Sequence, residues 1–170
     1  MESKKNLVFL GMMGSGKTTI GKSISKKLKL NFFDIDSLIE KKMGISISSI
    51  FNKKGEKFFR EIEEEITLDI LKKKNNVISL GGGGFLNSNI RKEIISNHIS
   101  IWLDWNVKTL VNRVNKSSRR PLAFNTSKGE LVNLIKKRSN IYSKAMYKVN
   151  CNNLSKIEVL NEALKIYENN

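Results

Sequence analysis

Eight residues near the start of the chain have the types and spacing needed to bind the phosphates of a nucleotide. Residues 11–18 read Gly-Met-Met-Gly-Ser-Gly-Lys-Thr and fill the G-x-x-x-x-G-K-[ST] pattern of a phosphate-binding loop. In such a loop, backbone N–H groups converge on a phosphate, which also meets the positive end of the following helix. Lys17 reaches the outer phosphates, and the Thr18 hydroxyl ligates Mg²⁺. The alternative, an accidental glycine turn, is disfavoured because a strand and a helix are expected on either side.

Two carboxylates, Asp34 and Asp36, come next along the chain, directly after the apolar Phe32 and Phe33. Beside a nucleoside triphosphate, one carboxylate can hold Mg²⁺ through its water shell, while the other orients an attacking hydroxyl or accepts its proton. The alternative is that Asp36 only caps a helix beginning at Ser37. Position at the end of a strand favours the functional interpretation.

A third segment, residues 81–84, consists of four glycines. Seven of the eleven glycines of the chain therefore lie in this segment and in the phosphate loop. Because glycine has no Cβ, such a run allows main-chain N–H groups to lie directly against a ligand. A flexible linker is the alternative, but a buried strand and the start of a helix are expected on either side.

Arginine is scarce in this chain, which has 6 Arg against 25 Lys. A guanidinium group binds a carboxylate or phosphate through two parallel hydrogen bonds that lysine cannot imitate. Arg60 either faces an acceptor pocket or pairs with Glu64, one turn further along a helix. Arg120 lies in the polar segment 113–126, next to the only proline, Pro121. An arginine on a loop that closes over reacting phosphates excludes water and neutralises developing charge.

The elements that must position these residues alternate along the chain. Strands are predicted at residues 6–10, 31–34, 77–80, 100–103 and 147–150. Helices are predicted at residues 18–28, 37–43, 48–53, 57–73, 87–96, 107–115, 129–145 and 154–167. Short apolar strands between helices favour a three-layer α/β/α fold with a central five-stranded parallel sheet. Ligands bind such sheets at the carboxyl ends of the strands, where the candidate residues fall.

Length and composition further limit the number of domains, the location of the protein and the kinds of binding site that it can form. A chain of 170 residues fits one domain, residues 1–170. The start of the chain carries only a four-residue apolar run, so we expect no signal peptide, no membrane partner and a cytoplasmic location. Cys151 and His98 are the only residues of their types, which excludes an intrachain disulfide and argues against a zinc site. A monomer is expected because no apolar association surface is readable.

The net charge of +15 raises the possibility of a nucleic-acid partner. However, the lysines are dispersed, with the longest run at residues 72–74, and no aromatic residues are interleaved for base stacking. We therefore expect solvated lysine faces and no nucleic-acid partner. The charge also attracts anionic substrates such as ATP.

Seven segments together resemble the shikimate kinase family, which is part of the nucleoside-monophosphate kinase-like group of phosphate-loop (P-loop) enzymes, over nearly the whole chain. They are G-M-M-G-S-G-K-T-T-I-G at 11–21, F-F-D-I-D-S-L-I-E at 32–40, G-I-S-I-S-S-I-F at 44–51, G-E-K-F-F-R-E-I-E at 55–63, I-S-L-G-G-G at 78–83, R-R-P-L at 119–122 and the helix bearing Arg138. The phosphate loop alone is shared by many families. The order F-D-x-D, G-E-x-x-F-R and triple glycine is specific.

The resemblance implies a reaction and a set of binding residues. The family transfers the γ-phosphate of ATP to the 3-hydroxyl of shikimate, on the route to chorismate and the aromatic amino acids. Shikimate would be bound by Asp36, Arg60, Gly82, Gly83 and Arg138. ATP would be bound by Gly11, Met12, Met13, Gly14, Ser15, Gly16, Lys17, Thr18, Thr19, Arg113 and Arg120.

The resemblance also implies catalytic roles. Lys17 and Arg120 would stabilise the phosphoryl oxygens, and Asp36 would orient the acceptor hydroxyl and take its proton. Mg²⁺ would be held by Thr18 and, through water, by Asp34. Arg113 would lie against the adenine. Residues from about 115 to 127 would form a mobile lid.

The chain departs from the family pattern at residues 150–155, Asn-Cys-Asn-Asn-Leu-Ser, where the family has a basic, proline-bearing loop beside the adenine. We therefore expect weaker nucleotide affinity or base selectivity. Gly84 is extra to the usual triple glycine and is assigned no role. Two rival classes remain. A gluconate kinase of the same fold would not combine Arg60 and Arg138 with the triple glycine, and a regulatory GTPase needs an Asn-Lys-x-Asp string, which this sequence lacks.

Overall fold

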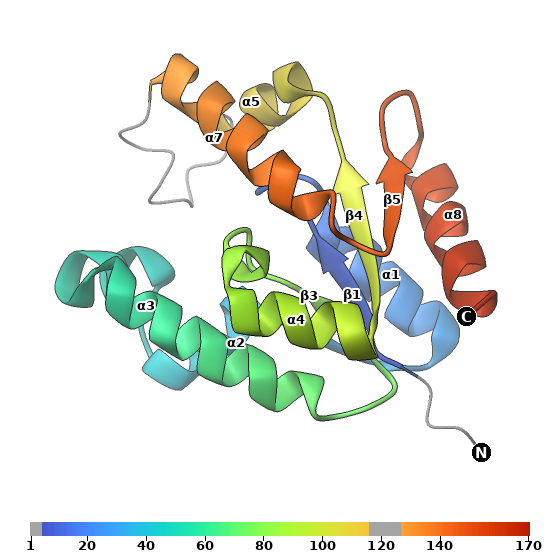
Figure 1. Cartoon of the computed structure of the whole chain (residues 1–170), viewed down its shortest axis with the longest axis horizontal. Coiled ribbons are helices and arrows are strands. Elements are labelled where there is room, and N and C mark those ends of the chain that lie inside the picture. The colour runs from blue at the N-terminus through green and yellow to red at the C-terminus, as the bar shows by residue number, and fades with distance from the viewer. Residues whose placement is uncertain (1–4, 116–126) are drawn as a thin grey trace.

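The computed structural model describes residues 5–115 and 127–170, with the Asn115 side chain left out. Within these residues, five parallel strands form one sheet in the order β2-β3-β1-β4-β5 (Figure 1). The strands are β1 (Leu7–Leu10), β2 (Asn31–Asp34), β3 (Asn76–Ser79), β4 (Ile99–Asp104) and β5 (Tyr147–Asn150). The predicted five-stranded parallel sheet is confirmed, with each strand within two residues of its predicted bounds.

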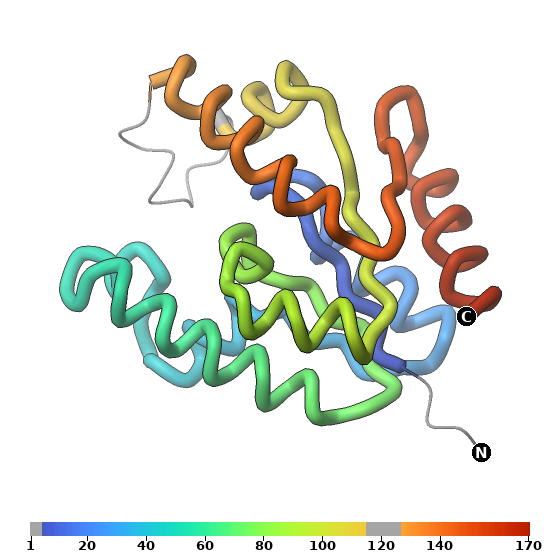
Figure 2. The backbone as a smooth tube through the Cα atoms, in the orientation of Figure 1, coloured from blue at the N-terminus to red at the C-terminus, as the bar shows by residue number. Residues whose placement is uncertain are grey.

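Helices cover both faces of the sheet and complete the predicted three layers. They are α1 (Lys17–Leu28), α2 (Ile35–Met43), α3 (Ile47–Leu71), α4 (Ser88–Asn97), α5 (Val107–Asn115), α7 (Lys128–Tyr142) and α8 (Lys156–Glu168), with a short 3₁₀ turn, η1 (Gly84–Leu86). One core lies between the sheet and helices α1 and α8, and the other lies between the sheet and helices α2, α3, α4, α5 and α7. The backbone trace places the α2–α3 segment and the β5–α8 segment at opposite ends of the molecule (Figure 2).

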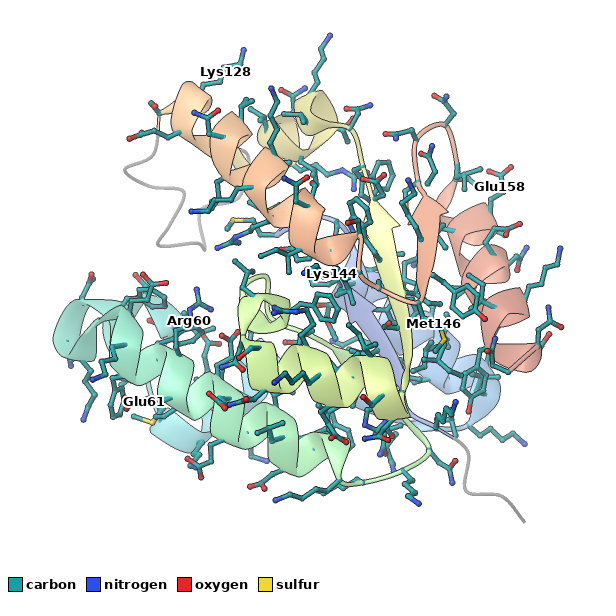
Figure 3. The ribbon with its side chains drawn as sticks, viewed as in Figure 1. Arg60, Glu61, Lys128, Lys144, Met146 and Glu158 are labelled. Carbon is teal, nitrogen blue, oxygen red and sulfur yellow. The ribbon has the colours of Figure 1, made fainter. Side chains whose placement is uncertain are left out.

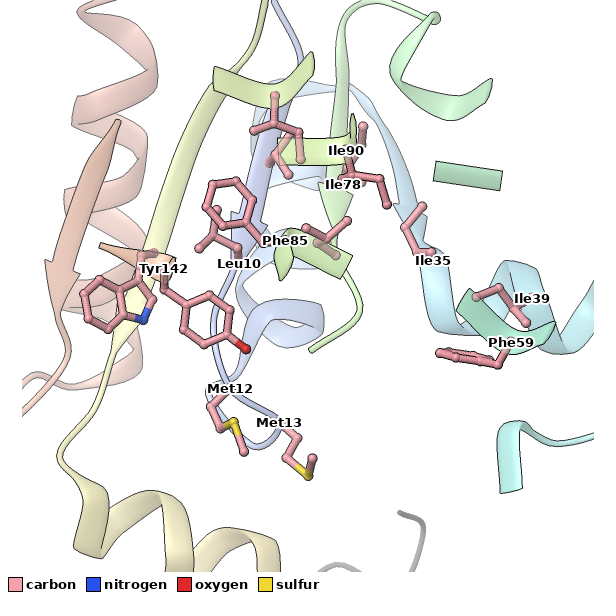
Figure 4. Close-up of a cluster of buried hydrophobic side chains, with 14 of the residues drawn as sticks. Leu10, Met12, Met13, Ile35, Ile39, Phe59, Ile78, Phe85, Ile90 and Tyr142 are labelled. Atoms are coloured by element: carbon pink, nitrogen blue, oxygen red, sulfur yellow. The ribbon is translucent and has the colours of Figure 1, made fainter. Parts of the chain in front are cut away.

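The first strand shows why its sequence is continuously apolar. Successive side chains of a strand point to opposite faces, so a strand covered on both faces needs apolar residues at every position. Val8 and Leu10 pack in the core beneath α3 and α4, whereas Leu7 and Phe9 pack against α1 and α8. Figure 4 shows Leu10 in the core beneath α3 and α4, with Ile78 and Phe85 beside it.

Two local features differ from the sequence predictions. The helix after β2 begins at Ile35, and its cap is Asp34, whose side chain accepts a hydrogen bond from the Ser37 N–H. Asp36 lies in the first turn of that helix, so the interpretation of Asp36 as a cap is wrong. The helices predicted at 48–53 and 57–73 form the single element α3, broken at Gly55, whose φ of 82° is left-handed.

The carboxyl ends of β1, β2 and β3 bring the three candidate segments to one edge of the sheet. β1 leads into the phosphate loop, β2 into the two aspartates and β3 into the glycine run. None of the helices in the described ranges is both long enough and apolar enough to cross a membrane.

Candidate active site

A cavity of about 560 Å³ opens at this edge of the sheet. It brings together residues predicted to bind ATP, shikimate and metal: Met13, Gly14, Gly16, Lys17, Thr18, Thr19, Asp34, Asp36, Arg60, Gly82, Gly83 and Arg138. The other predicted loop residues, Gly11, Met12 and Ser15, are buried behind the cavity wall. Figure 4 shows Met12 and Met13 at the turn that follows β1.

The phosphate loop has the backbone that its glycines predict. Gly11, Gly14 and Gly16 have φ values of 141°, 79° and 92°, a region that L-residues rarely adopt. The Lys17 ammonium group donates hydrogen bonds to the Gly11 and Met12 carbonyls, at 2.9 and 3.0 Å. The lysine is therefore held against the loop, on the wall of the cavity.

Thr18 and Asp34 form the predicted metal-binding pair. The Thr18 hydroxyl donates to Asp34 Oδ2 at 2.6 Å and lies 3.5 Å from the Ser79 hydroxyl. Mg²⁺ prefers oxygen ligands and usually keeps several waters, binding through one or two carboxylates plus substrate phosphates. No cluster of three or more His, Cys, Asp or Glu residues forms among the described residues. A hydroxyl and a carboxylate in contact beside a phosphate loop fit Mg²⁺ held jointly with a nucleotide.

Asp36 shares its side of the cavity with a second carboxylate, Glu63 on α3. A Cβ atom built on Gly81 would lie 2.7 Å from Asp36 Oδ1 and 2.5 Å from Glu63 Oε1. Glycine at 81 therefore leaves room for both carboxylates. Burial raises the pKa of Glu63, and the charge of Asp36 adds to the effect, although Arg60 and Arg138 oppose it.

Arg60 is held by two carboxylates of its own helix. Its guanidinium group donates to Glu63 Oε2 at 2.6 Å and to Glu56 Oε1 at 3.1 and 3.3 Å. The suggested partner Glu64 instead accepts hydrogen bonds from the Asn87 and Asn89 side chains, so that pairing was wrong. In Figure 3 Arg60 lies on the upper side of α3.

Arg138 reaches the cavity from α7 and is only 5% exposed. Its Nη1 lies 3.8 Å from the Met12 sulfur, and within the described part of the chain its Nε has no hydrogen-bond partner. One turn further along α7, the Tyr142 hydroxyl donates to the Gly82 carbonyl. Burial raises the pKa of Tyr142 to about 12, so this hydroxyl stays a donor at neutral pH. A buried cation with an unused donor suits an anionic ligand.

Arg113 lies outside the cavity, behind the phosphate loop. Its guanidinium carbon is 3.8 Å from the centroid of the Trp105 ring, and its Nη1 donates to the Gly14 carbonyl at 3.1 Å. The atypical segment 150–155 reaches the same region, because Asn152 Oδ1 accepts a hydrogen bond from the Asn106 N–H at 2.8 Å. Arg120 and most of the expected lid, residues 116–126, lie outside the described residues.

Four residues of the site were not singled out from the sequence: Glu63, Ser79, Trp105 and Tyr142. A usable signal existed for two of them. Glu63 follows Arg60 by three residues, which places the pair on one helix face. Trp105 directly follows the fourth strand, the position where ligand-facing residues gather. Nothing local marks Ser79 or Tyr142, because their partners are 61 and 60 residues away in sequence.

Comparison with known proteins gives a consistent result. The family described as shikimate kinase matches residues 13–168. The chain is 42% identical to a shikimate kinase of Bacillus subtilis over 168 residues, covering 96% of this chain and 90% of the relative. Among solved structures, the shikimate kinase of Acinetobacter baumannii in complex with shikimate matches with a TM-score of 0.91 and 29% identity, covering 99% and 95% of the two chains. The shikimate kinase of Aquifex aeolicus matches with a TM-score of 0.86 and 36% identity, covering 96% of each chain.

Proposed function

The chain belongs to the shikimate kinase family, and we propose that its cavity binds shikimate between Arg60 and Arg138 and presents the acceptor hydroxyl to Asp36. The protein catalyses the ATP-dependent phosphorylation of shikimate, giving shikimate 3-phosphate and ADP. This reaction lies on the route to the aromatic amino acids. The residue roles argued below rest on the geometry of the cavity.

One observation carries the proposed orientation of shikimate. Two guanidinium groups, on α3 and α7, line the same cavity as the phosphate loop. Arg138 is buried, and its Nε donor has no partner among the described residues, whereas Arg60 is fixed by Glu56 and Glu63. A carboxylate between the two cations would receive charge-assisted hydrogen bonds from both. The Gly82–Gly83 backbone lies beside both groups and would form the floor of the site.

With the carboxylate held there, a ring hydroxyl would be presented to the carboxylate of Asp36, which lies beside Glu63 near Gly81. In the transfer, the bond between the shikimate 3-oxygen and the γ-phosphorus forms while the bond from that phosphorus to the bridging oxygen of ADP breaks. The hydroxyl proton passes to the Asp36 carboxylate. Because the transition state of phosphoryl transfer is loose, holding the hydroxyl in line contributes more than basicity.

The phosphates are bound by the loop from Gly11 to Thr19, whose N–H groups and following helix stabilise negative charge. Lys17 exchanges its two loop carbonyls for phosphate oxygens and stabilises charge on the transferred group. Thr18 and, through water, Asp34 would hold Mg²⁺, which supplies charge neutralisation at the phosphates when bound. Arg120 and a closing lid over residues 115–127 stay predictions, since they lie largely outside the described residues.

We also propose that the protein acts as a cytoplasmic monomer, with residues 1–170 forming one catalytic domain, Arg113 next to the adenine, and no nucleic-acid partner. The single five-stranded sheet supports one domain, and the small, anionic substrates of the reaction suit the positive charge without a nucleic-acid partner. Sedimentation of the purified protein tests the monomer directly.

The test of function is the release of ADP from ATP and Mg²⁺ in the presence of single acceptors. We expect release with shikimate and only background release with gluconate or nucleoside monophosphates. Release that is equal with gluconate, or independent of any acceptor, would contradict the proposed pocket.

A further inference from the structure

Trp105, to which the proposed function gives no role, contacts the phosphate loop directly. Its indole N–H donates to the Ser15 carbonyl at 2.9 Å, across 90 residues of sequence. Its ring face carries the guanidinium group of Arg113, whose Nη1 donates to the adjacent carbonyl of Gly14. Two consecutive carbonyls of the loop are therefore held from the same side by one stacked pair.

This contact determines the orientation of a backbone N–H group that would donate a hydrogen bond to phosphate. The peptide bond is planar and trans, so the N–H of Gly16 points opposite to the C=O of Ser15. Trp105 holds that carbonyl away from the cavity, and Gly16 lines the cavity. The Gly16 N–H is thus directed to the side where phosphate binds. Gly16 has a φ of 92°, and a Cβ there would meet none of the described residues within 4 Å, so side-chain packing does little to restrain this peptide.

We infer that Trp105 is a positioning residue for the nucleotide, acting on the phosphates through the Ser15–Gly16 peptide and on the base through Arg113. A guanidinium group has two faces, and Trp105 covers one of them. Arg113 is exposed, and its other face is where adenine would stack. The inference rests on the proposed ATP site and adds a residue to it.

The position of Trp105 is itself supported by the atypical segment after β5. Asn152 accepts a hydrogen bond from the Asn106 N–H, and the Cys151 N–H donates to the Asp104 carbonyl at 2.8 Å. The residues on both sides of Trp105 are thereby tied to that segment. Cys151 and Asn152 therefore help to hold the chain on both sides of Trp105 in place.

Two substitutions separate the two actions of Trp105. Trp105→Phe keeps an aromatic face for Arg113 but has no N–H, whereas Trp105→Leu loses both. Dissociation constants are measured by calorimetry, without shikimate, for inorganic tripolyphosphate and for ATP, each with Mg²⁺. We expect Trp105→Phe to raise the dissociation constants of both ligands by the same factor, about three- to tenfold, which corresponds to the loss of one hydrogen bond. Trp105→Leu is expected to raise the dissociation constant of ATP by a larger factor than that of tripolyphosphate.

The dissociation constant for shikimate, measured on the same variants, is the internal control for folding. It is expected to be unchanged, because Arg60 and Arg138 do not contact Trp105. Wild-type affinity of Trp105→Phe for tripolyphosphate would overturn the inference, and so would an equal loss of shikimate affinity. The proposed function fails separately, if the wild-type enzyme releases no ADP in response to shikimate.

Discussion

The guanidinium group of Arg60 occupies the space that a side chain at position 83 would need. A Cβ atom built on Gly83 would overlap Arg60 Nη1, with the guanidinium carbon at 2.6 Å. The Arg60 guanidinium group can therefore occupy this position only because Gly83 has no side chain. Glycine is needed at this position because of the neighbouring Arg60 side chain and not because of the turn itself, since the φ of −100° at Gly83 suits any residue.

Gly83→Ala should therefore impair shikimate binding with little loss of stability. The overlap involves the end of a flexible side chain, so the protein can relieve it by displacing Arg60. We expect the KM for shikimate to rise about tenfold or more, since charge-assisted hydrogen bonds to the carboxylate are lost. The KM for ATP should stay within about twofold. Steady-state kinetics on Gly83→Ala tests this, with Gly129→Ala as the control because an added Cβ there meets none of the described residues within 4 Å. An unchanged KM for shikimate in Gly83→Ala would contradict the proposed role of Arg60.

Arg60→Lys keeps the positive charge but loses the planar fork. Lysine cannot pair with Glu56 and Glu63 while also giving two parallel hydrogen bonds to a carboxylate. We expect weaker shikimate binding, by about tenfold or more, at an unchanged affinity for ATP. The test measures the dissociation constants of shikimate and of ATP for wild type and for Arg60→Lys. Equal affinities of the two proteins for shikimate would contradict the proposed role of Arg60 in shikimate binding.

Tyr142→Phe should affect both stability and substrate binding. It leaves the Gly82 carbonyl without its hydroxyl donor, which costs about 1–2 kcal/mol of unfolding free energy, or about 3–6 °C in Tm for a chain of this size. The KM for shikimate should also rise, because the Gly82–Gly83 backbone borders the site. Tyr147→Phe removes a hydroxyl that donates to the exposed Asn170 side chain, so this variant is the matched control and should melt like wild type. Equal melting of both variants would refute the structural role of the Tyr142 hydroxyl.

His98 should make the protein less stable below neutral pH. Burial lowers the pKa of this histidine below its ordinary 6.5, the nearby Lys5 lowers it further, and Glu93, with Oε1 3.6 Å from Nε2, opposes both. A base with a lowered folded pKa is more readily protonated when unfolded. The contribution of neutral His98 to the free energy of unfolding is therefore complete above pH 6.5. It is lost as the pH falls from 6.5 to the pKa of His98 in the folded protein.

Two measurements check this prediction. As the only histidine, His98 gives a single set of imidazole proton signals by NMR, and its pKa should titrate below 6.5. The unfolding free energy of His98→Gln should depend less steeply on pH between 5 and 7 than that of wild type. A folded pKa at or above 6.5 would contradict the argument.

The sequence predicted the sheet, the helices and most of the residues that line the cavity, because these follow from local patterns. Apolar runs identified the strands, and the phosphate-loop spacing located Lys17 and Thr18. What could not be predicted depends on contacts between distant segments. The glycine run was expected to bring N–H groups to a ligand, whereas Gly81 and Gly83 are also needed to make room for Asp36, Glu63 and Arg60.

The role of Trp105 shows the same limit. An aromatic residue after a strand suggests packing, and only the folded chain shows its N–H on the Ser15 carbonyl. Likewise, Asp34 rather than Asp36 caps α2, because the helix begins two residues earlier than the pattern predicts. That difference frees Asp36 from a capping role and leaves its carboxylate on the cavity wall.

The central claim is that Asp36 faces the acceptor hydroxyl of shikimate. The most direct test compares the turnover number for shikimate-dependent ADP release in wild type and in Asp36→Asn. Asparagine keeps the size of the side chain but cannot accept the proton. The account predicts a fall in kcat of about a hundredfold or more, with shikimate still bound by Arg60 and Arg138. Turnover by Asp36→Asn within a few-fold of wild type would contradict it.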